Sequence, residues 1–214
     1  MKIRFFNPGL GYQKIRSEIL SEIDRVLWNG DLILRKDVED FEKQVADYVG
    51  TKYCVALNSC TDALYLALRG LGIGQGDEVL VPSRTFVASA QVIVQVGATP
   101  VYVDLDGKFT ITEKTKAIIP VHIEGAFGAD MEYLIDFAKK NNIYVIEDAA
   151  QAFGATQNGK KAGSFGIAGC FSFYPAKTLG CAGDGGALVT NDEELYKWVK
   201  DARNHFKEDA RDWG

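Results

Sequence analysis

The first fifty positions carry apolar side chains at helical spacing, in two groups separated by a break. The apolar positions are Ile15, Ile23, Val26 and Leu27 in the first group and Val38, Phe41, Val45 and Tyr48 in the second. Side chains at this spacing fall on one face of a helix. The break at Asn29-Gly30 suits the end of a helix, because glycine is common there. Two amphipathic helices are therefore expected before the first strand.

From Tyr53 onward, short continuous apolar runs alternate with helical stretches. Such runs are typical of strands in a mainly parallel sheet covered on both faces. The expected strands are residues 53–57, 78–81, 99–103, 117–121, 143–146 and 185–190, and the expected helices are residues 61–71, 86–96, 131–140 and 193–203. Glycine-rich segments at 72–76 and 180–185 are expected to be loops, not repeats. The pattern predicts one α/β domain over residues 1–214, a three-layer α/β/α arrangement with a mainly parallel, mixed sheet.

Length and composition agree with this fold and argue against several classes of protein. The 214 residues are 47% hydrophobic and 25% charged, which allows a substantial core. A formal net charge of −5 opposes nucleic-acid binding, and the lysine pairs at 139–140 and 160–161 are too short to reverse it. We find no signal-peptide pattern and no run of roughly 18 apolar residues that would span a membrane. A cytoplasmic protein that binds neither nucleic acid nor membrane is expected.

Cysteine and histidine content bears on disulfides and metal sites. The chain has four cysteines, with neither a CxxC pair nor the density of a disulfide scaffold. Its two histidines, His122 and His205, do not belong to a ligand-spaced cluster. Reduced thiols and the absence of a metal site are therefore expected.

Side chains that could bind a ligand or react follow several of the expected strands, where doubly wound sheets bind ligands. The segment 58–62 lies between a strand and a helix, so its free amides and the helix dipole suit an anion. An ordinary helix cap by Ser59 or Thr61 is the alternative explanation. Phe86 follows the second strand, and its ring suits either a planar ligand or the core.

Two further strands end near an acid and an amine. Asp148 ends an apolar run, where an ionised carboxylate needs a cation or several hydrogen bonds; a structural ion pair or cap is the alternative. Ser172 and Lys177 lie five residues apart beside a glycine-rich loop, although a single lysine is by default a surface residue. Together, an anion-binding turn, an aromatic ring, an acid and an amine match what one pyridoxal 5'-phosphate (PLP) requires.

Short motifs also occur in a fixed order along nearly the whole chain. They are Gly30-Asp-Leu-Ile-Leu, Val38-Glu-Asp-Phe-Glu, Asn58-Ser-Cys-Thr-Asp-Ala-Leu, Gly72-Ile-Gly-Gln-Gly-Asp-Glu-Val, Thr85-Phe-Val-Ala, Gly97-Ala-Thr-Pro-Val, Pro120-Val-His, Glu147-Asp-Ala-Ala-Gln and Gly183-Asp-Gly-Gly-Ala. This series resembles the DegT/DnrJ/EryC1/StrS family of sugar aminotransferases. The resemblance implies the large PLP-binding domain of the type I aminotransferase fold.

The resemblance also assigns roles to individual residues. It implies that Lys177 forms the Schiff base with PLP and then moves a proton between substrate and cofactor. Asp148 would keep the pyridine nitrogen protonated, which makes the ring an electron sink. The other implied cofactor contacts are Phe86 against the ring, Gln151 beside the phenolic oxygen, and the amides of Cys60 and Thr61 with the Ser172 hydroxyl at the phosphate.

The reaction implied by the resemblance is a two-stage transamination. An amino acid, glutamate or glutamine, loads the cofactor, and a nucleotide-linked keto sugar then receives the amine. Lys177 argues against the dehydratase branch, in which histidine replaces the lysine. A PLP-dependent lyase, a cyclitol transaminase and a non-catalytic or regulatory protein with this fold remain alternatives. A homodimer is expected, because cofactor sites of the family lie between subunits.

Three features depart from the family pattern. Similar proteins continue beyond Gly214 with a stretch that reaches the neighbouring subunit's cofactor and with a small C-terminal domain. We therefore expect a truncated form, the large domain with its N-terminal helices, without the small domain that covers the substrate. Cys60 stands where many relatives have glycine, and the loop at 124–128 differs from the commoner glycine-proline version, so no substrate contact is assigned to it.

Overall fold

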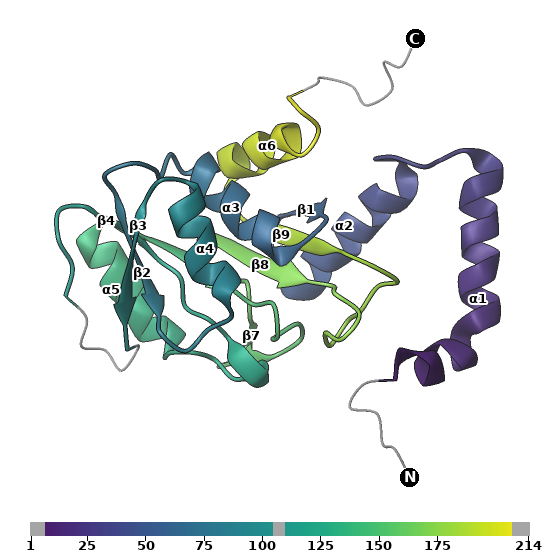
Figure 1. Ribbon diagram of the computed structural model, residues 1–214, viewed down its shortest axis with the longest axis horizontal. Coiled ribbons are helices and arrows are strands. Elements are labelled where there is room, and N and C mark those ends of the chain that lie inside the picture. The colour runs from purple at the N-terminus through teal and green to yellow at the C-terminus, as the bar shows by residue number, and fades with distance from the viewer. Residues whose placement is uncertain (1–6, 105–109, 207–214) are drawn as a thin grey trace.

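The computed structural model describes residues 7–104 and 110–206 and shows a seven-stranded sheet with helices on both faces (Figure 1). The strands of the main sheet are β1 (Tyr53–Leu57), β2 (Glu78–Pro82), β3 (Thr99–Val103), β4 (Thr115–Ile118), β5 (Tyr144–Asp148), β8 (Ala168–Ser172) and β9 (Gly186–Thr190). The short strands β6 (Thr156–Gln157) and β7 (Lys160–Lys161) pair only with each other. The helices are α1 (Pro8–Asn29), α2 (Lys36–Val49), α3 (Cys60–Gly70), α4 (Val87–Gln95), α5 (Met131–Asn141), α6 (Glu193–Ala202) and the 3-10 helix η1 (Ile123–Gly125).

The strand order in the main sheet is β1-β9-β8-β5-β4-β2-β3. β9 is antiparallel to both of its neighbours, and the other neighbouring strands are parallel. The predicted mixed, mainly parallel sheet is therefore confirmed. Because β1, β5 and β8 run in the same direction, their carboxyl ends meet at one edge of the sheet, together with the start of β9.

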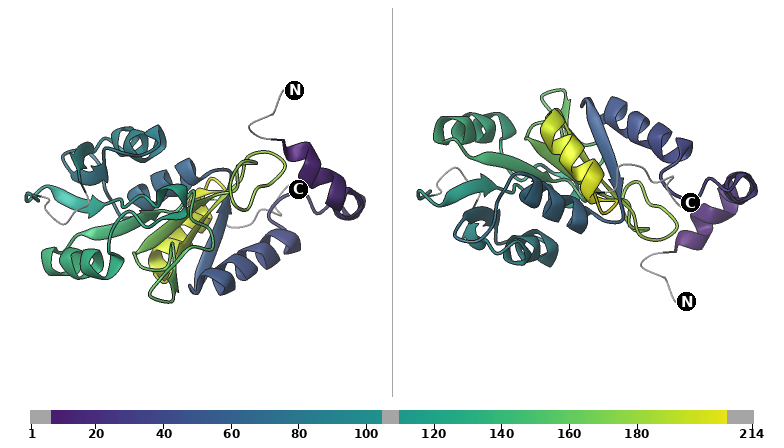
Figure 2. Two further views of the ribbon diagram at one scale, coloured as in Figure 1. Left: turned by 90° about the horizontal axis from the view of Figure 1, so that it is seen from below. Right: turned by 90° about the horizontal axis from the view of Figure 1, so that it is seen from above.

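Both faces of the sheet are covered, which gives the predicted three layers (Figure 2). One buried cluster lies under α3, α4 and α6 and includes Leu64, Leu68 and Ile93. On the opposite face, α2 contributes Val45 to a second cluster and α5 contributes Leu134 to a third. Burying a side chain of this size contributes about 1.5–3 kcal/mol, so the two faces together supply the main stabilisation of the sheet.

α1 stands apart from these layers (Figure 1). It starts at Pro8 and ends at Asn29. The next residue, Gly30, has a left-handed φ of 72°, and its N–H donates to the Leu27 carbonyl oxygen, so the predicted break between the first two helices is confirmed. No side chain of α1 is buried, and Ile23 and Leu27 are among its exposed apolar residues. Within the described ranges, no helix is both long and apolar enough to cross a membrane.

The structure corrects several predicted strands. The strand expected at 117–121 is β4, which ends at Ile118, and Val121 makes only an isolated bridge to Asp148. Pro120 explains the early end, because proline has no N–H to continue the ladder. The strand expected at 143–146 continues to Asp148 as β5. β8 and the β6–β7 pair are additional strands that the apolar pattern does not predict.

Candidate active site

One cavity at the carboxyl edge of the sheet brings together every residue selected from the sequence. It has a volume of about 460 Å³, and its lining includes Cys60, Thr61, Phe86, Asp148, Gln151, Ser172 and Lys177. These residues come from four separate segments of the chain, so only the sheet topology brings them together. The acid and the amine on which the interpretation depends, Asp148 and Lys177, therefore share one cavity.

The β1–α3 turn (residues 58–61) forms one wall of this cavity. Ser59 is the N-cap of α3, and its side-chain oxygen accepts a hydrogen bond from the Asp62 N–H at 3.0 Å. The cap alternative is thus correct, but it leaves the amides of Cys60 and Thr61 in the first helical turn, where no intrahelical acceptor exists. Free amides at the positive end of a helix suit a phosphate.

The position of this turn depends on Gly186 at the start of β9. A Cβ atom at Gly186 would lie 2.3 Å from the Ser59 carbonyl carbon and 2.6 Å from the Cys60 nitrogen. Only glycine allows the two main chains to approach so closely. On the neighbouring strand, Ser172 ends β8 with its hydroxyl oxygen 3.3 Å from the Tyr174 N–H, and it lines the same cavity.

Asp148 contributes a buried carboxylate to the lining of the cavity. Only 5% of the residue is exposed. Its oxygens accept hydrogen bonds from the Ser89 hydroxyl at 2.6 Å, the Ala150 N–H at 3.2 Å and the Cys60 thiol at 3.8 Å. All of these donors, within the described residues, are neutral, so the structural ion pair considered above is not found there. A buried carboxylate with neutral neighbours favours a cationic ligand atom.

The buried carboxylate affects the pKa values of two neighbouring thiols. Burial, followed by the Asp148 charge, raises the pKa of Cys60 well above its ordinary value, and the Lys177 charge acts in the opposite direction. Burial, Asp148 and Glu147 raise the pKa of Cys170 in the same way. Both thiols therefore stay protonated at neutral pH, and Cys60 acts as a hydrogen-bond donor to the carboxylate.

Lys177 lies on the loop that joins β8 to β9. The loop is closed at its base by hydrogen bonds from the Phe173 N–H to the Gly185 carbonyl oxygen at 2.7 Å and from the Cys181 N–H to the Phe173 carbonyl oxygen at 2.8 Å. Lys177 itself is half-buried, and it lines the cavity. Because adjacent strands hold both ends of the loop, the amine is presented from a fixed base.

Phe86 and Gln151 also line the cavity. Phe86 precedes α4 and is 69% exposed, which excludes the core alternative. The Gln151 side-chain oxygen accepts a hydrogen bond from the Glu124 N–H at 2.9 Å. The Gln151 side chain therefore keeps its NH₂ group as a donor for a ligand oxygen. Glu124 also pairs with the exposed Arg84 at 3.1 Å.

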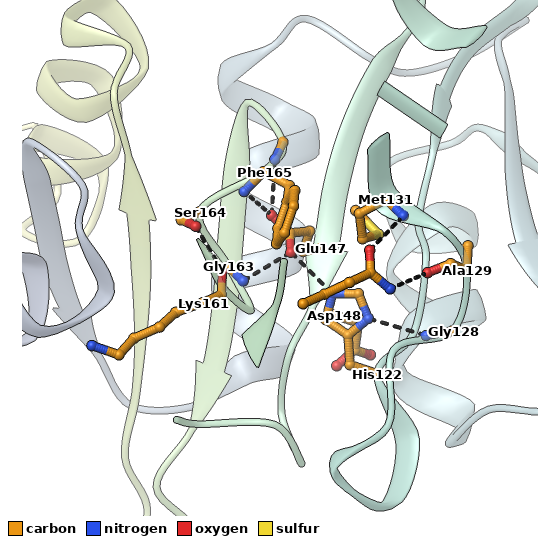
Figure 3. Close-up of polar contacts among 12 residues, drawn as sticks. His122, Gly128, Ala129, Met131, Glu147, Asp148, Lys161, Gly163, Ser164 and Phe165 are labelled. Carbon is orange, nitrogen blue, oxygen red and sulfur yellow. Dashed lines mark hydrogen bonds and ion pairs between the residues drawn. The ribbon is translucent and has the colours of Figure 1, made fainter. Parts of the chain in front are cut away.

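A buried network beside Asp148 was not expected from the sequence (Figure 3). Glu147 precedes Asp148 on β5 and points to the opposite face, and both its side chain and that of His122 are fully buried. The Glu147 carboxylate accepts hydrogen bonds from the N–H groups of Gly163, Phe165 and Gly166 at 2.7–2.8 Å and lies 2.9 Å from His122 Nε2. The only signal in the sequence is an acidic residue inside an apolar run.

The network also fixes the tautomer of His122. Its Nδ1 atom accepts the Gly128 N–H at 3.3 Å, so the neutral tautomer with the proton on Nε2 donates to Glu147. The His122 main-chain N–H donates to the Asp148 carbonyl oxygen at 2.9 Å. His122 also lines the cavity, together with Tyr174 and Asp184, which sequence reasoning did not select.

Known proteins of one family resemble the chain in sequence. The sequence model of the DegT/DnrJ/EryC1/StrS aminotransferase family matches residues 13–213. The chain is 48% identical over 204 residues to a UDP-N-acetyl-3-dehydro-alpha-D-glucosamine 3-aminotransferase of Acidithiobacillus ferrooxidans, covering 91% of this chain and 55% of the relative. It is 44% identical over 214 residues to a dTDP-3-amino-3,4,6-trideoxy-alpha-D-glucose transaminase of Streptomyces venezuelae, covering 95% and 56%.

A regulatory protein also resembles the chain. The pleiotropic regulatory protein of Geobacillus stearothermophilus is 42% identical over 215 residues, covering 96% of this chain and 58% of the relative. This chain thus spans little more than half the length of the curated relatives it matches.

Among solved structures, S. venezuelae DesV in complex with a ketimine intermediate superposes with a TM-score of 0.91. It is 42% identical in sequence, with 98% of this chain and 59% of that chain covered. The fold is therefore that of the PLP-dependent aminotransferases, as the resemblance implied. The chain belongs to the DegT/DnrJ/EryC1/StrS aminotransferase family.

Proposed function

We propose that this chain forms the PLP-binding part of an aminotransferase that moves an amino group from glutamate or glutamine to a nucleotide-linked keto sugar. The observation that carries the proposal is the common cavity of Lys177, Asp148 and the β1–α3 turn. Family membership and the two nucleotide-sugar transaminases among the relatives support the class of substrate.

The residues present fit PLP at both of its charged ends. The amides of Cys60 and Thr61, with the Ser172 hydroxyl, would bind the phosphate, since α3 begins there. At the other end, the Asp148 carboxylate has only neutral donors around it in the described structure, so it would accept a hydrogen bond from a protonated ring nitrogen. When bound, PLP supplies an aldehyde that carries the amino group and a ring that withdraws electrons from the reacting carbon.

The remaining side chains would orient the ring and move protons. Phe86 offers an exposed apolar ring to one face of the cofactor, and the Gln151 NH₂ group would donate to its phenolic oxygen. The Lys177 amine would hold the cofactor covalently. After its release, Nζ would take a proton from the substrate carbon bonded to the amino nitrogen and return one to the cofactor carbon on the other side of that nitrogen. The fixed loop base between β8 and β9 keeps this amine within the cavity.

Cofactor binding tests the proposal directly. The wild-type chain should bind PLP, and borohydride reduction followed by peptide mass spectrometry should find the cofactor on Lys177. Lys177→Ala should abolish this label, whereas Lys139→Ala, on the outer side of α5, should leave it unchanged. A wild-type chain that does not bind PLP, or a label on another lysine, would refute the assignment.

A second candidate function is a regulatory protein with the same cofactor site, supported by the similar regulatory protein of G. stearothermophilus. Assays with glutamate or glutamine and nucleotide-linked keto sugars separate the two candidates. Amino transfer to a sugar rejects the regulatory function, whereas PLP binding without any transfer favours it. A cyclitol transaminase would instead accept keto cyclitols in the same assay.

We further propose that the chain works as a homodimer in the cytoplasm. The exposed apolar side chains of α1 and the exposed Phe86 and Tyr174 at the cavity support association with a second copy. The free cysteines of the described residues suit a reducing compartment. Light scattering coupled to size-exclusion chromatography should give the mass of a dimer, and a monomer at all concentrations would contradict this proposal.

A further inference from the structure

β1 lies at an edge of the sheet, yet the outward-facing main-chain groups of Ala56 are not free. The Ala56 N–H donates to the Glu42 carboxylate at 2.7 Å, and its carbonyl oxygen accepts a hydrogen bond from Arg203 Nη1 at 3.1 Å. Glu42 belongs to α2, whereas Arg203 directly follows α6. Two helices from distant parts of the chain are therefore tied to one residue of the edge strand.

Glu42 and Arg203 also form an ion pair with each other. Their side chains are 11% and 9% exposed, and they line a second, larger cavity of about 730 Å³ between α2, β1 and α6. Removing two charges from water offsets most of what a buried ion pair contributes to stability. No described residue accepts a hydrogen bond from the buried Arg203 Nε, which adds a further penalty. Stability alone is a weak explanation for this pair.

The location of Ala56 suggests what the pair does. Ala56 precedes the β1–α3 turn by one residue, Leu57. The far side of the turn packs against Gly186, with almost no space between the two main chains. On the near side, the pair fixes the N–H and the carbonyl of Ala56. The turn is thus held between β9 on one side and the Glu42–Arg203 pair on the other.

We infer that Glu42 and Arg203 are positioning residues for the phosphate of the cofactor: by fixing Ala56, they set where the amides of Cys60 and Thr61 point. This inference rests on the proposed function, because it assigns the phosphate to the β1–α3 turn. It predicts that the pair acts on affinity for the phosphate group and not on affinity for the ring.

Comparing PLP with pyridoxal, which lacks the phosphate, tests this prediction. The double variant Glu42→Met with Arg203→Met replaces the pair by apolar side chains of similar size, a change that buried ion pairs often tolerate without loss of stability. In equilibrium dialysis, PLP should bind about tenfold to a hundredfold more weakly than to wild type, the effect of losing one or two well-placed donors to a charged group. The affinity for pyridoxal should change by less than about twofold on the same scale.

Two further variants complete the experiment. Arg203→Lys keeps the buried positive charge, and hence the fold, but not the planar fork, so it should lose part of the PLP affinity and none of the pyridoxal affinity. Asp47→Asn removes the exposed Lys43–Asp47 pair on the same helix and should change neither. Equal losses for PLP and pyridoxal, or no loss for either, would overturn the inference. If wild type itself fails to bind PLP, the proposed function fails and the inference fails with it.

Discussion

Replacing Glu147 by glutamine tests the buried network beside the cavity. The carboxylate has four neutral donors around it, two at each oxygen: Phe165 and Gly166 N–H at Oε1, and Gly163 N–H and the His122 ring at Oε2. Glutamine has nearly the same shape, but one oxygen becomes an NH₂ group that cannot accept. His122 cannot compensate by changing tautomer, because its Nδ1 atom must then donate toward the Gly128 N–H.

The expected loss follows from these contacts. A hydrogen bond to a charged group contributes about 1.5–3 kcal/mol, and two are lost whichever way the amide lies, so Glu147→Gln should lower the free energy of unfolding by about 3–6 kcal/mol. That is a large part of the roughly 5–15 kcal/mol of a typical domain. The variant should therefore unfold at a much lower urea concentration than wild type.

Urea denaturation followed by circular dichroism measures this difference. Glu18→Gln on the exposed surface of α1 removes the same charge and should shift stability by less than about 0.5 kcal/mol. If Glu147→Gln lost less than about 1 kcal/mol, the carboxylate would not be held by four donors, and the account of the network would be wrong.

Three other perturbations have defined outcomes. Gly186→Ala should destabilise the protein by about 1–3 kcal/mol in urea denaturation and weaken PLP binding, because the added Cβ meets main-chain atoms. The control Gly11→Ala, which has open space around it in α1, should be neutral or stabilising, and equal effects of the two substitutions would contradict the contact at Gly186. A thiol reagent at pH 8 should label Cys181 quickly and the three buried cysteines only after unfolding, and rapid labelling of all four would refute this. Stability should also fall as pH rises above about 8.5, because burial raises the pKa values of the native thiols, which stay protonated while the unfolded thiols ionise. Asp148→Asn should weaken PLP binding about tenfold to a hundredfold in equilibrium dialysis through loss of a charge-assisted hydrogen bond, and an unchanged affinity would remove Asp148 from the cofactor site.

The fold was predictable where local pattern and burial agree. The apolar spacing around Val45 predicts α2, because residues at helical spacing face the core from each turn. The apolar run before Asp148 predicts β5, because a strand covered on both faces is buried along its length. β8 was not predicted, since Ala168 and Gly169 have weak strand preference and are buried only through their neighbours in the sheet. The segment around Pro120 shows the opposite case: the apolar run continues to Val121, although β4 ends at Ile118.

The site divides in the same way. Asp148 was selected because ligands bind at strand ends, a rule that needs only the order of elements along the chain, whereas the role of Lys177 came from the family resemblance. This rule could not predict the partners of Glu147. The N–H groups that bind its carboxylate lie in a loop 16–19 residues away, whose course is set by tertiary packing. Glu42 did leave a signal: it lies three residues before Val45, on the apolar face of α2, where a charge requires a partner.

The antiparallel insertion of β9 has a consequence for how the protein is made. β1 emerges from the ribosome early, but its partner in the sheet, which pairs Tyr53 with Thr190, is synthesised after every other described strand of the sheet. Until then β1 has no neighbouring strand, and the glycine against which its following turn rests does not yet exist. Pairing over such a sequence separation is slow, so the nascent chain completes the cavity only after β9 has left the ribosome.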